Sequence, residues 1–201
     1  INKDIKIHKI KSGTKVFDWI VPSEWVIKDA FVEDKFGKKI INFKKNNLHL
    51  INYSKPFSST LTLKNLLKKI YSLPDKPNSI PYITSYYKKN WGFCTTHDHK
   101  KKIANSYNEK DKFKVKILSK FKDNGYMHYA DLLIKGKSNK EILISTYCCH
   151  PSMANNEISG PLLSSLLIKH YSKKKNNLSI RFLFVPETIG AIAYLNKNLR
   201  I

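Results

Sequence analysis

The fold is decided by the stretch CHPSMANNEISGP, residues 149–161, which joins an apolar segment to an amphipathic one. The apolar segment, residues 141–147 (EILISTY), is rich in β-branched and apolar residues and ends at polar ones, which predicts a buried strand. The segment after the stretch carries leucines at helical spacing, namely Leu162, Leu163, Leu166 and Leu167. The sequence therefore predicts a strand, a polar loop that contains His150 and Glu157, and a helix whose leucine face packs inward.

The same pattern recurs once, further along the chain. Residues 179–185 (SIRFLFV) predict a second apolar strand, residues 186–190 (PETIG) follow it, and residues 191–199 predict a helix. In open α/β sheets, ligand sites lie beyond the carboxyl ends of the strands. A histidine from one strand end and a carboxylate from the next suit a metal or a general base.

Four stretches resemble the zinc aminopeptidase superfamily, which includes the bacterial leucyl aminopeptidases. They are residues 12–19 (SGTKVFDW), 80–87 (IPYITSYY), 150–161 and 186–190. They match more closely a bacterial, aminopeptidase-like branch that is sometimes named for polysaccharide biosynthesis and has a domain of unknown function inserted in the peptidase domain. Because the four stretches sample nearly the whole chain in order, the chain is identified as a member of this branch.

The resemblance implies an α/β fold: part of a zinc-aminopeptidase-like sheet flanked by helices, with a smaller inserted α+β domain. Residues 1–13 would form the first strand of the aminopeptidase-like domain, residues 14–112 the insert, and residues 113–201 the rest of that domain. The chain starts at Ile1 rather than Met and stops soon after a helix pattern. We therefore expect a fragment, and the resemblance implies further metal ligands beyond residue 201.

Within the expected insert, residues 25–34 and 39–43 predict a hairpin around the turn at Gly37. Residues 60–71 (TLTLKNLLKKIY) predict a helix that ends before Pro74.

The resemblance assigns His150 as the first zinc-binding histidine. The superfamily follows it with an Asp-Asn-x-Ser-Gly turn, whose aspartate bridges two zinc ions. This chain reads Asn156-Glu157-Ile158-Ser159-Gly160, so Asn156 stands in the place of the bridging aspartate. A neutral amide cannot neutralise two dications. Either Glu157 substitutes from one position along, or the site holds one metal, or it holds none.

The second motif also departs from the superfamily, which has two consecutive glutamates, the first a general base and the second a ligand. Here Glu187 takes the place of the base, and Thr188, a poor zinc ligand, takes that of the ligand. Either Glu187 binds the metal and another group acts as base, or one metal site is lost. We expect Glu187 to be catalytic and the metal-site residues to be His150, Asn156 and Glu157, with one or two zinc ions and no other cofactor.

The resemblance favours a zinc-dependent hydrolase that cleaves an amide or peptide bond in a peptide-like or small amide substrate. The alternative is a non-catalytic binding module for a peptide or glycan precursor, which would use the aromatic-rich stretch between Pro81 and Cys94. Each site residue also has a structural interpretation, as a satisfied strand-end histidine or as a helix-start or capping side chain. A Cys149–His150 thiol dyad is disfavoured, because adjacent residues of a strand point to opposite faces.

Bulk composition excludes several classes of protein. The 201 residues carry 37 basic and 15 acidic side chains, a net charge of +22, but only Arg181 and Arg200 are arginine. Nucleic-acid readers rely on arginine, so we expect a solvated lysine surface and no specific nucleic-acid partner. No apolar run is long enough to span a membrane. Three cysteines form no disulfide framework, which favours the cytoplasm. The oligomeric state is left open.

Overall fold

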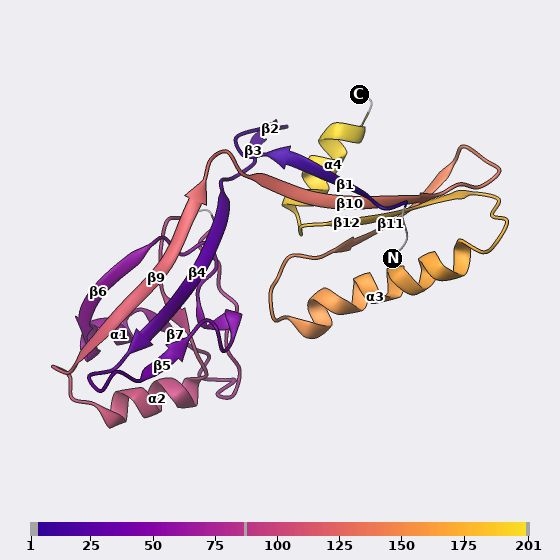
Figure 1. Cartoon of the computed structure of the whole chain (residues 1–201). Coiled ribbons are helices and arrows are strands. Elements are labelled where there is room, and N and C mark those ends of the chain that lie inside the picture. Colours follow the sequence, from indigo (N-terminus) through magenta and orange to yellow (C-terminus); the bar gives the residue numbers. More distant parts are fainter. Residues whose placement is uncertain (1–3, 87, 200–201) are drawn as a thin grey trace. The chain divides into compact units, whose positions relative to one another are not determined.

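The computed structural model describes residues 4–86 and 88–199, so Tyr87, part of one stretch that carries the resemblance, lies outside it. The chain divides into two compact units (Figure 1). Unit 1 comprises Ile1–Glu24 and Lys122–Ile201, and unit 2 is Trp25–Phe121, so unit 2 is inserted in the sequence of unit 1.

Unit 1 is built on a four-stranded mixed sheet with the order β1-β10-β12-β11. Its strands are β1 (Lys6–Lys11), β10 (Tyr126–Ile134), β11 (Glu141–Tyr147) and β12 (Ser179–Val185). β1 and β12 both pair with β10 antiparallel, whereas β11 and β12 are parallel, with Tyr147 opposite Val185. Both strands predicted around the site are therefore present, and their carboxyl ends lie at one edge of the sheet. The expectation that residues 141–147 are buried was wrong, because β11 is an edge strand on which Ile142 and Leu143 are exposed.

Two helices cover opposite faces of this sheet. Side chains along β12 alternate between the two faces, so neighbouring residues of this strand contact different helices. Phe182 faces α3 (Ala154–Tyr171), where Leu167, Ile168 and Tyr171 pack against its cluster. Leu183 faces α4 (Ile189–Asn198), together with Ala191 and Tyr194. A short hairpin, β2 (Lys15–Val16) and β3 (Trp19–Ile20), adds a further cluster in which Val16 packs with Ala193 of α4.

The structure corrects two predictions about the helix after the site loop. The helix begins at Ala154 instead of Leu162, so it includes Asn156, Glu157 and Pro161. Only Leu167 of the predicted leucine face packs on the sheet, whereas Leu162, Leu163 and Leu166 are each more than half exposed. The face that covers the sheet is offset from it around the helix. Apolar spacing identifies that a helix forms but cannot decide between two apolar faces.

A buried carboxylate is neutralised on the α4 side of the sheet. Asp131 on β10 is 5% exposed; it accepts a hydrogen bond from Arg181 on β12 and lies 2.5 Å from Nε2 of His8 on β1. Arg181 also donates to Glu141 on β11. A buried charge must be paired to be tolerated, and this row of polar side chains supplies the partners across all four strands.

Unit 2 has its own core beneath an antiparallel-paired sheet, with the order β5-β4-β9-β6. The four strands of this sheet are β4 (Glu24–Glu33), β5 (Lys39–Asn42), β6 (Phe57–Thr62) and β9 (Lys112–Lys122). Two further short strands of unit 2, β7 (Ile70–Tyr71) and β8 (Phe93–Cys94), pair with each other. Its helices are the 3-10 turn η1 (Asn47–His49), α1 (Leu63–Leu67) and α2 (His97–Ser106). Phe93 and Phe113 are fully buried in its core.

Two expectations for the insert differ from unit 2. The helix predicted over residues 60–71 is only the five-residue α1, because Thr60 to Thr62 pair with β9 as part of β6. The expected insert, 14–112, also differs from the compact unit Trp25–Phe121. The β2–β3 hairpin packs on α4 and so belongs to unit 1, while β9 extends to Lys122. The β4–β5 hairpin is present as predicted.

We expect Gly160→Ala to destabilise the protein, because a Cβ on Gly160 would clash with Oγ1 of Thr146 on β11 and lie 3.2 Å from its Cβ. Alanine in a helix normally gains about 1 kcal/mol over glycine. An overpacked contact costs about 1–3 kcal/mol, and the restricted χ1 of the β-branched threonine leaves it few rotamers that would relieve the contact. Urea unfolding measures the net loss of stability.

The matched control is Ser159→Ala, at an exposed position whose Oγ donates to the Asn155 carbonyl. Thr146→Ala in the Gly160→Ala background should restore part of the lost stability. A Gly160→Ala protein as stable as wild type would show that α3 does not approach β11 as closely as the structure has it.

Candidate functional site

The candidate site lies at the carboxyl ends of β11 and β12. Tyr147 and Val185 are paired in parallel register, and the Cys148 N–H donates to the Val185 carbonyl at 3.0 Å. The segments that follow, residues 148–153 and 186–188, therefore leave the sheet side by side. This is the position at which open α/β sheets bind ligands.

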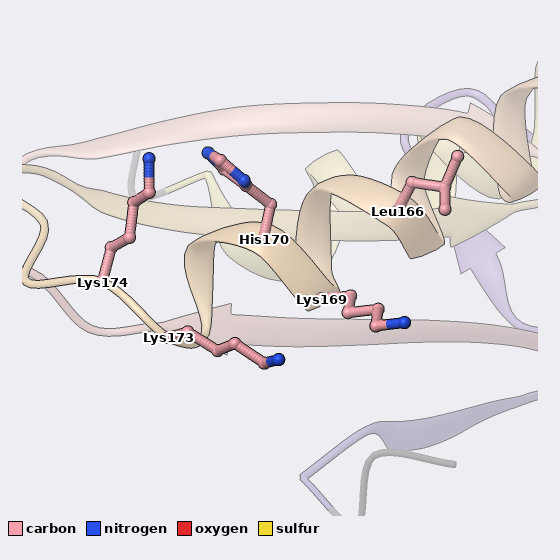
Figure 2. A pocket seen from close by; sticks show the side chains of 5 residues that line it. All are labelled: Leu166, Lys169, His170, Lys173 and Lys174. Atoms are coloured by element: carbon pink, nitrogen blue, oxygen red, sulfur yellow. The ribbon is translucent and has the colours of Figure 1, made fainter.

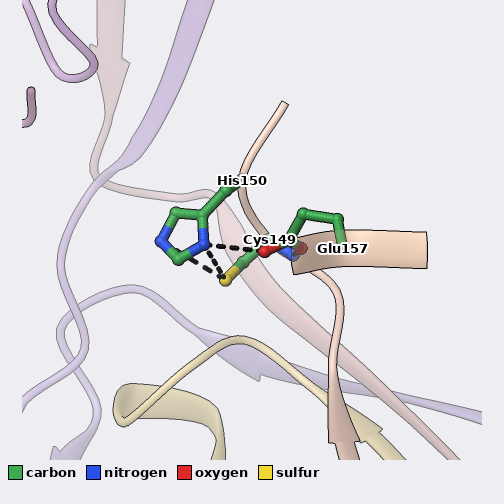
Figure 3. Close-up of side chains that lie close together, drawn as sticks. All are labelled: Cys149, His150 and Glu157. Carbon is green, nitrogen blue, oxygen red and sulfur yellow. Dashed lines mark hydrogen bonds and ion pairs between the residues drawn. The ribbon is translucent and has the colours of Figure 1, made fainter. Parts of the chain in front are cut away.

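His150 lies between two carboxylates, one on each ring nitrogen. Nδ1 is 2.7 Å from Oε1 of Glu157, and Nε2 is 3.3 Å from Oε2 of Glu187. Figure 3 shows the His150 ring facing the Glu157 carboxylate at the start of α3. The structure thus brings together three of the residues singled out from the sequence, and they come from two different strand ends.

Glu157 fastens the site loop to the first turn of α3. Besides the His150 ring, its carboxylate accepts a hydrogen bond from the Cys149 backbone N–H. Although desolvation acts to raise it, the pKa of Glu157 is lowered from its usual value, because backbone N–H groups of Cys149 and His150 and the His150 ring all interact with the ionised form. An ionised Glu157 also suits the N-terminal end of a helix.

Glu187 is half exposed and is followed by a strained turn. Thr188 has φ +57° and ψ −69°, and the Ile189 N–H donates to the Glu187 carbonyl at 2.6 Å. This is a γ-turn of the rare type with positive φ. Such a conformation costs of order 1–3 kcal/mol for a residue with a side chain and tends to occur at functional sites. The turn places the Glu187 carboxylate beside the His150 ring.

Cys149 belongs to the same cluster, which the sequence argument missed. Its Sγ lies 3.6 Å from Nδ1 and 3.8 Å from Nε2 of His150, and it accepts a hydrogen bond from the Glu187 backbone N–H. The expectation that Cys149 and His150 face opposite ways was wrong, because β11 ends at Tyr147 and strand alternation no longer applies. The predicted strand already ended at Tyr147, so strand alternation should not have been applied to Cys149 and His150.

The geometry does not suit Cys149 as a nucleophile. A sulfur aligned with one ring nitrogen would be clearly farther from the other, whereas the two distances here are nearly equal. Desolvation and the carboxylates of Glu157 and Glu187 raise the pKa of the Cys149 thiol to about 11. Catalytic cysteines have a lowered pKa instead.

Asn156 and Thr188 are the residues that the resemblance aligns with carboxylates, and neither supplies a charge to the cluster around His150. The side-chain amide of Asn156 donates to the Tyr147 hydroxyl at 3.1 Å. Thr188 is the centre of the γ-turn. The expected ligand role of Asn156 stays a prediction.

The cluster around His150 fits a metal ion. Ligand atoms of Cys149, His150 and Glu157 lie within 4.8 Å of one another, the one such group among the described residues. Neutral imidazole, thiolate and carboxylate are the ligands that zinc prefers. Two neighbouring negative side chains in a strongly basic protein also favour a cation at this point.

An open depression lies at the other end of α3 and does not belong to this site. Figure 2 shows its lining side chains: Leu166, Lys169, His170, Lys173 and Lys174. Its volume is about 420 Å³. Three ammonium groups disfavour a metal cation there.

None of the helices in the described part of the chain has the length and apolar character needed to cross a membrane.

Comparison with known proteins gives relatives over the whole chain. A family model described as a domain of unknown function, DUF4910, matches residues 1–201. A curated Clostridium acetobutylicum protein named "Putative polysaccharide biosynthesis protein with aminopeptidase-like domain" is 46% identical over 194 residues, which are 96% of this chain and 43% of that protein. The chain therefore spans less than half the length of this relative.

Solved structures give the same result for the fold. The crystal structure of a "putative peptidase" from Clostridium acetobutylicum has a TM-score of 0.90 at 46% identity and covers 96% of this chain and 44% of that one. BSAP, a zinc aminopeptidase from Bacillus subtilis, has a TM-score of 0.61 at 11% identity, with 98% of this chain and 55% of that one covered. These matches confirm the predicted α/β, aminopeptidase-like fold and the resemblance to the aminopeptidase-like branch.

Proposed function

The chain belongs to the DUF4910 family, and from its fold and the side chains around His150 we propose a zinc-dependent hydrolase of the aminopeptidase type. The substrate would be a peptide-like or small amide compound. One observation carries the proposal: the carboxylates of Glu157, in the first turn of α3, and of Glu187, just after β12, flank the two nitrogens of one histidine. The aminopeptidase-like domain in the name of the Clostridium acetobutylicum relative supports the same reaction class.

His150 would hold the metal through Nε2. Its Nδ1 lies 2.7 Å from Glu157, which fixes the orientation of the ring. Histidine ligands of metals usually donate their second N–H to a carboxylate in this way. Glu157, expected as a ligand, would then act mainly as the residue that positions His150.

Glu187 would accept the proton of the attacking water. Its carboxylate lies 3.3 Å from Nε2, on the side where the metal would bind, and it is half exposed to incoming substrate. A bound zinc ion would lower the pKa of a coordinated water and polarise the scissile carbonyl. Glu187 would bind the proton taken from that water and pass it to the leaving amine.

The binding-module alternative is favoured by a separate observation. Neither Asn156 nor Thr188 supplies the carboxylate that a two-zinc site needs. In the aromatic stretch between Pro81 and Cys94, Trp91 and Phe93 are buried in the core of unit 2, and Tyr86 is half-buried and meets Tyr53 edge-on at 5.1 Å, so a sugar ring or peptide would be recognised by the exposed part of Tyr86. The free thiols Cys148 and Cys149 are exposed, which supports a reducing compartment such as the cytoplasm for either function.

The test is zinc binding together with hydrolysis. We expect the purified protein to bind zinc stoichiometrically by calorimetry after chelator treatment, and to hydrolyse aminoacyl p-nitroanilides only when zinc is restored. Zinc binding without hydrolysis of any such substrate would favour the binding module. Failure to bind zinc would contradict the proposed function itself.

A further inference from the structure

We propose that Cys149 is a ligand of the metal that His150 holds, so that the site contains a metal–sulfur bond. The proposal rests on the proposed function for the presence of a metal. Neither the superfamily motifs nor the sequence pattern predicts Cys149 as a metal ligand. A Cys149 thiolate ligand also replaces part of the negative charge that is lost with Asn156.

The first argument is the spacing of the side chains. Zinc–sulfur and zinc–nitrogen bond lengths at a tetrahedral angle separate the two ligand atoms by about 3.6 Å. The Sγ of Cys149 lies 3.8 Å from Nε2 and 3.6 Å from Nδ1 of His150. A tetrahedral zinc on Nε2 would hold the sulfur about 5 Å from Nδ1, so metal binding would turn the Cys149 side chain away from Nδ1 while its spacing from Nε2 hardly changes.

The second argument is how the backbone holds the sulfur in place. Cys149 Sγ accepts a hydrogen bond from the Glu187 N–H at 3.3 Å, and the Cys149 N–H donates to Glu157. Backbone N–H donors to sulfur are a common way of orienting and stabilising a ligating thiolate. Both ends of Cys149 are therefore tied to the two carboxylate residues of the site.

The neighbouring residue, Cys148, lacks these features. It is exposed, its backbone N–H continues the pairing with β12, and its sulfur is not part of the group of convergent ligand atoms. Only one of two adjacent thiols thus faces His150, which makes Cys148 a matched control for Cys149.

A thiolate ligand has a consequence for metal choice. Sulfur favours zinc and cobalt over magnesium and manganese, which prefer oxygen ligands. We therefore expect the protein to bind cobalt as a spectroscopic substitute for zinc and to bind magnesium weakly at the same site.

The experiment is cobalt substitution, with metal content measured separately by mass spectrometry. The cobalt-loaded wild-type protein should show a sulfur-to-cobalt charge-transfer band in the near ultraviolet. Cys149→Ser should lose this band and bind zinc at least about 10-fold more weakly, since even a group that only orients a ligand contributes about 10- to 100-fold. Cys148→Ser should keep both the band and the affinity.

Each other outcome is decisive. Stoichiometric cobalt without a sulfur band in the wild type, or a band that survives in Cys149→Ser, would overturn the inference and leave the proposed function standing. Absence of bound metal would overturn both. If Cys149→Ser does not fold by circular dichroism, zinc X-ray absorption on the wild type decides instead: a sulfur neighbour at about 2.3 Å is expected, and a shell of only nitrogen and oxygen would refute it.

Discussion

Replacing His150 with alanine is expected to abolish zinc binding and, with it, hydrolysis. The ring contacts Glu157, Glu187 and Cys149. Its loss would remove the proposed ligand and would leave the Glu157 and Glu187 carboxylates without a shared partner. Because the loss of a group that only orients a ligand weakens metal binding by about 10- to 100-fold, we expect more than about 100-fold here. Zinc calorimetry and the p-nitroanilide assay measure the two effects.

A matched control separates the site from the many other basic groups. His170 on α3 is an exposed histidine in the lysine-lined depression at the far end of the helix. His170→Ala should leave zinc affinity and hydrolysis unchanged. If His150→Ala bound zinc as tightly as His170→Ala, the metal would lie elsewhere and the His150 cluster would be a hydrogen-bonded helix start.

The position of the site was predictable from the sequence because it depends on short-range pattern. Two apolar segments, each followed by polar side chains, predict two strand ends, and β11 and β12 are indeed adjacent and parallel. Adjacent carboxyl ends bring their loops together whatever the loop sequence is. That is why His150 and Glu187, 37 positions apart in the printed sequence, could be expected at one place.

The local geometry was not predictable, because it depends on where elements begin and end. The helix α3 starts at Ala154, so Glu157 reaches back to the loop as a first-turn side chain. Cys149 turns toward His150 only because β11 has already ended. The positive φ of Thr188 could not be read from PETIG, since threonine rarely adopts it.

Long-range pairing accounts for the errors in the fold. Thr60 and Thr62 look like the start of a helix, yet they pair with β9. Cross-strand partners decide whether such residues form a strand, and those partners lie some fifty positions away in the sequence. The leucines of α3 show the related limit that an apolar face does not reveal which surface covers it.

Glu187→Gln separates proton transfer from metal binding. Glutamine keeps the size and hydrogen-bonding shape of the side chain but cannot take up a proton at neutral pH. We expect hydrolysis to fall by about 100- to 10,000-fold, the range for loss of a general acid–base group, with zinc affinity reduced far less than in His150→Ala. Steady-state kinetics should place the loss in kcat, because the substrate still binds.

The control for Glu187→Gln is Glu109→Gln, at an exposed position in unit 2. It removes the same charge and should change neither kcat nor zinc affinity. A Glu187→Gln protein that loses zinc as completely as His150→Ala would reassign Glu187 as a ligand. Its distance of 3.3 Å from Nε2 is also close to the spacing of two ligand atoms on one zinc ion. Comparing the loss of hydrolysis with the loss of zinc affinity in Glu187→Gln therefore decides whether Glu187 acts as the general base or as a metal ligand.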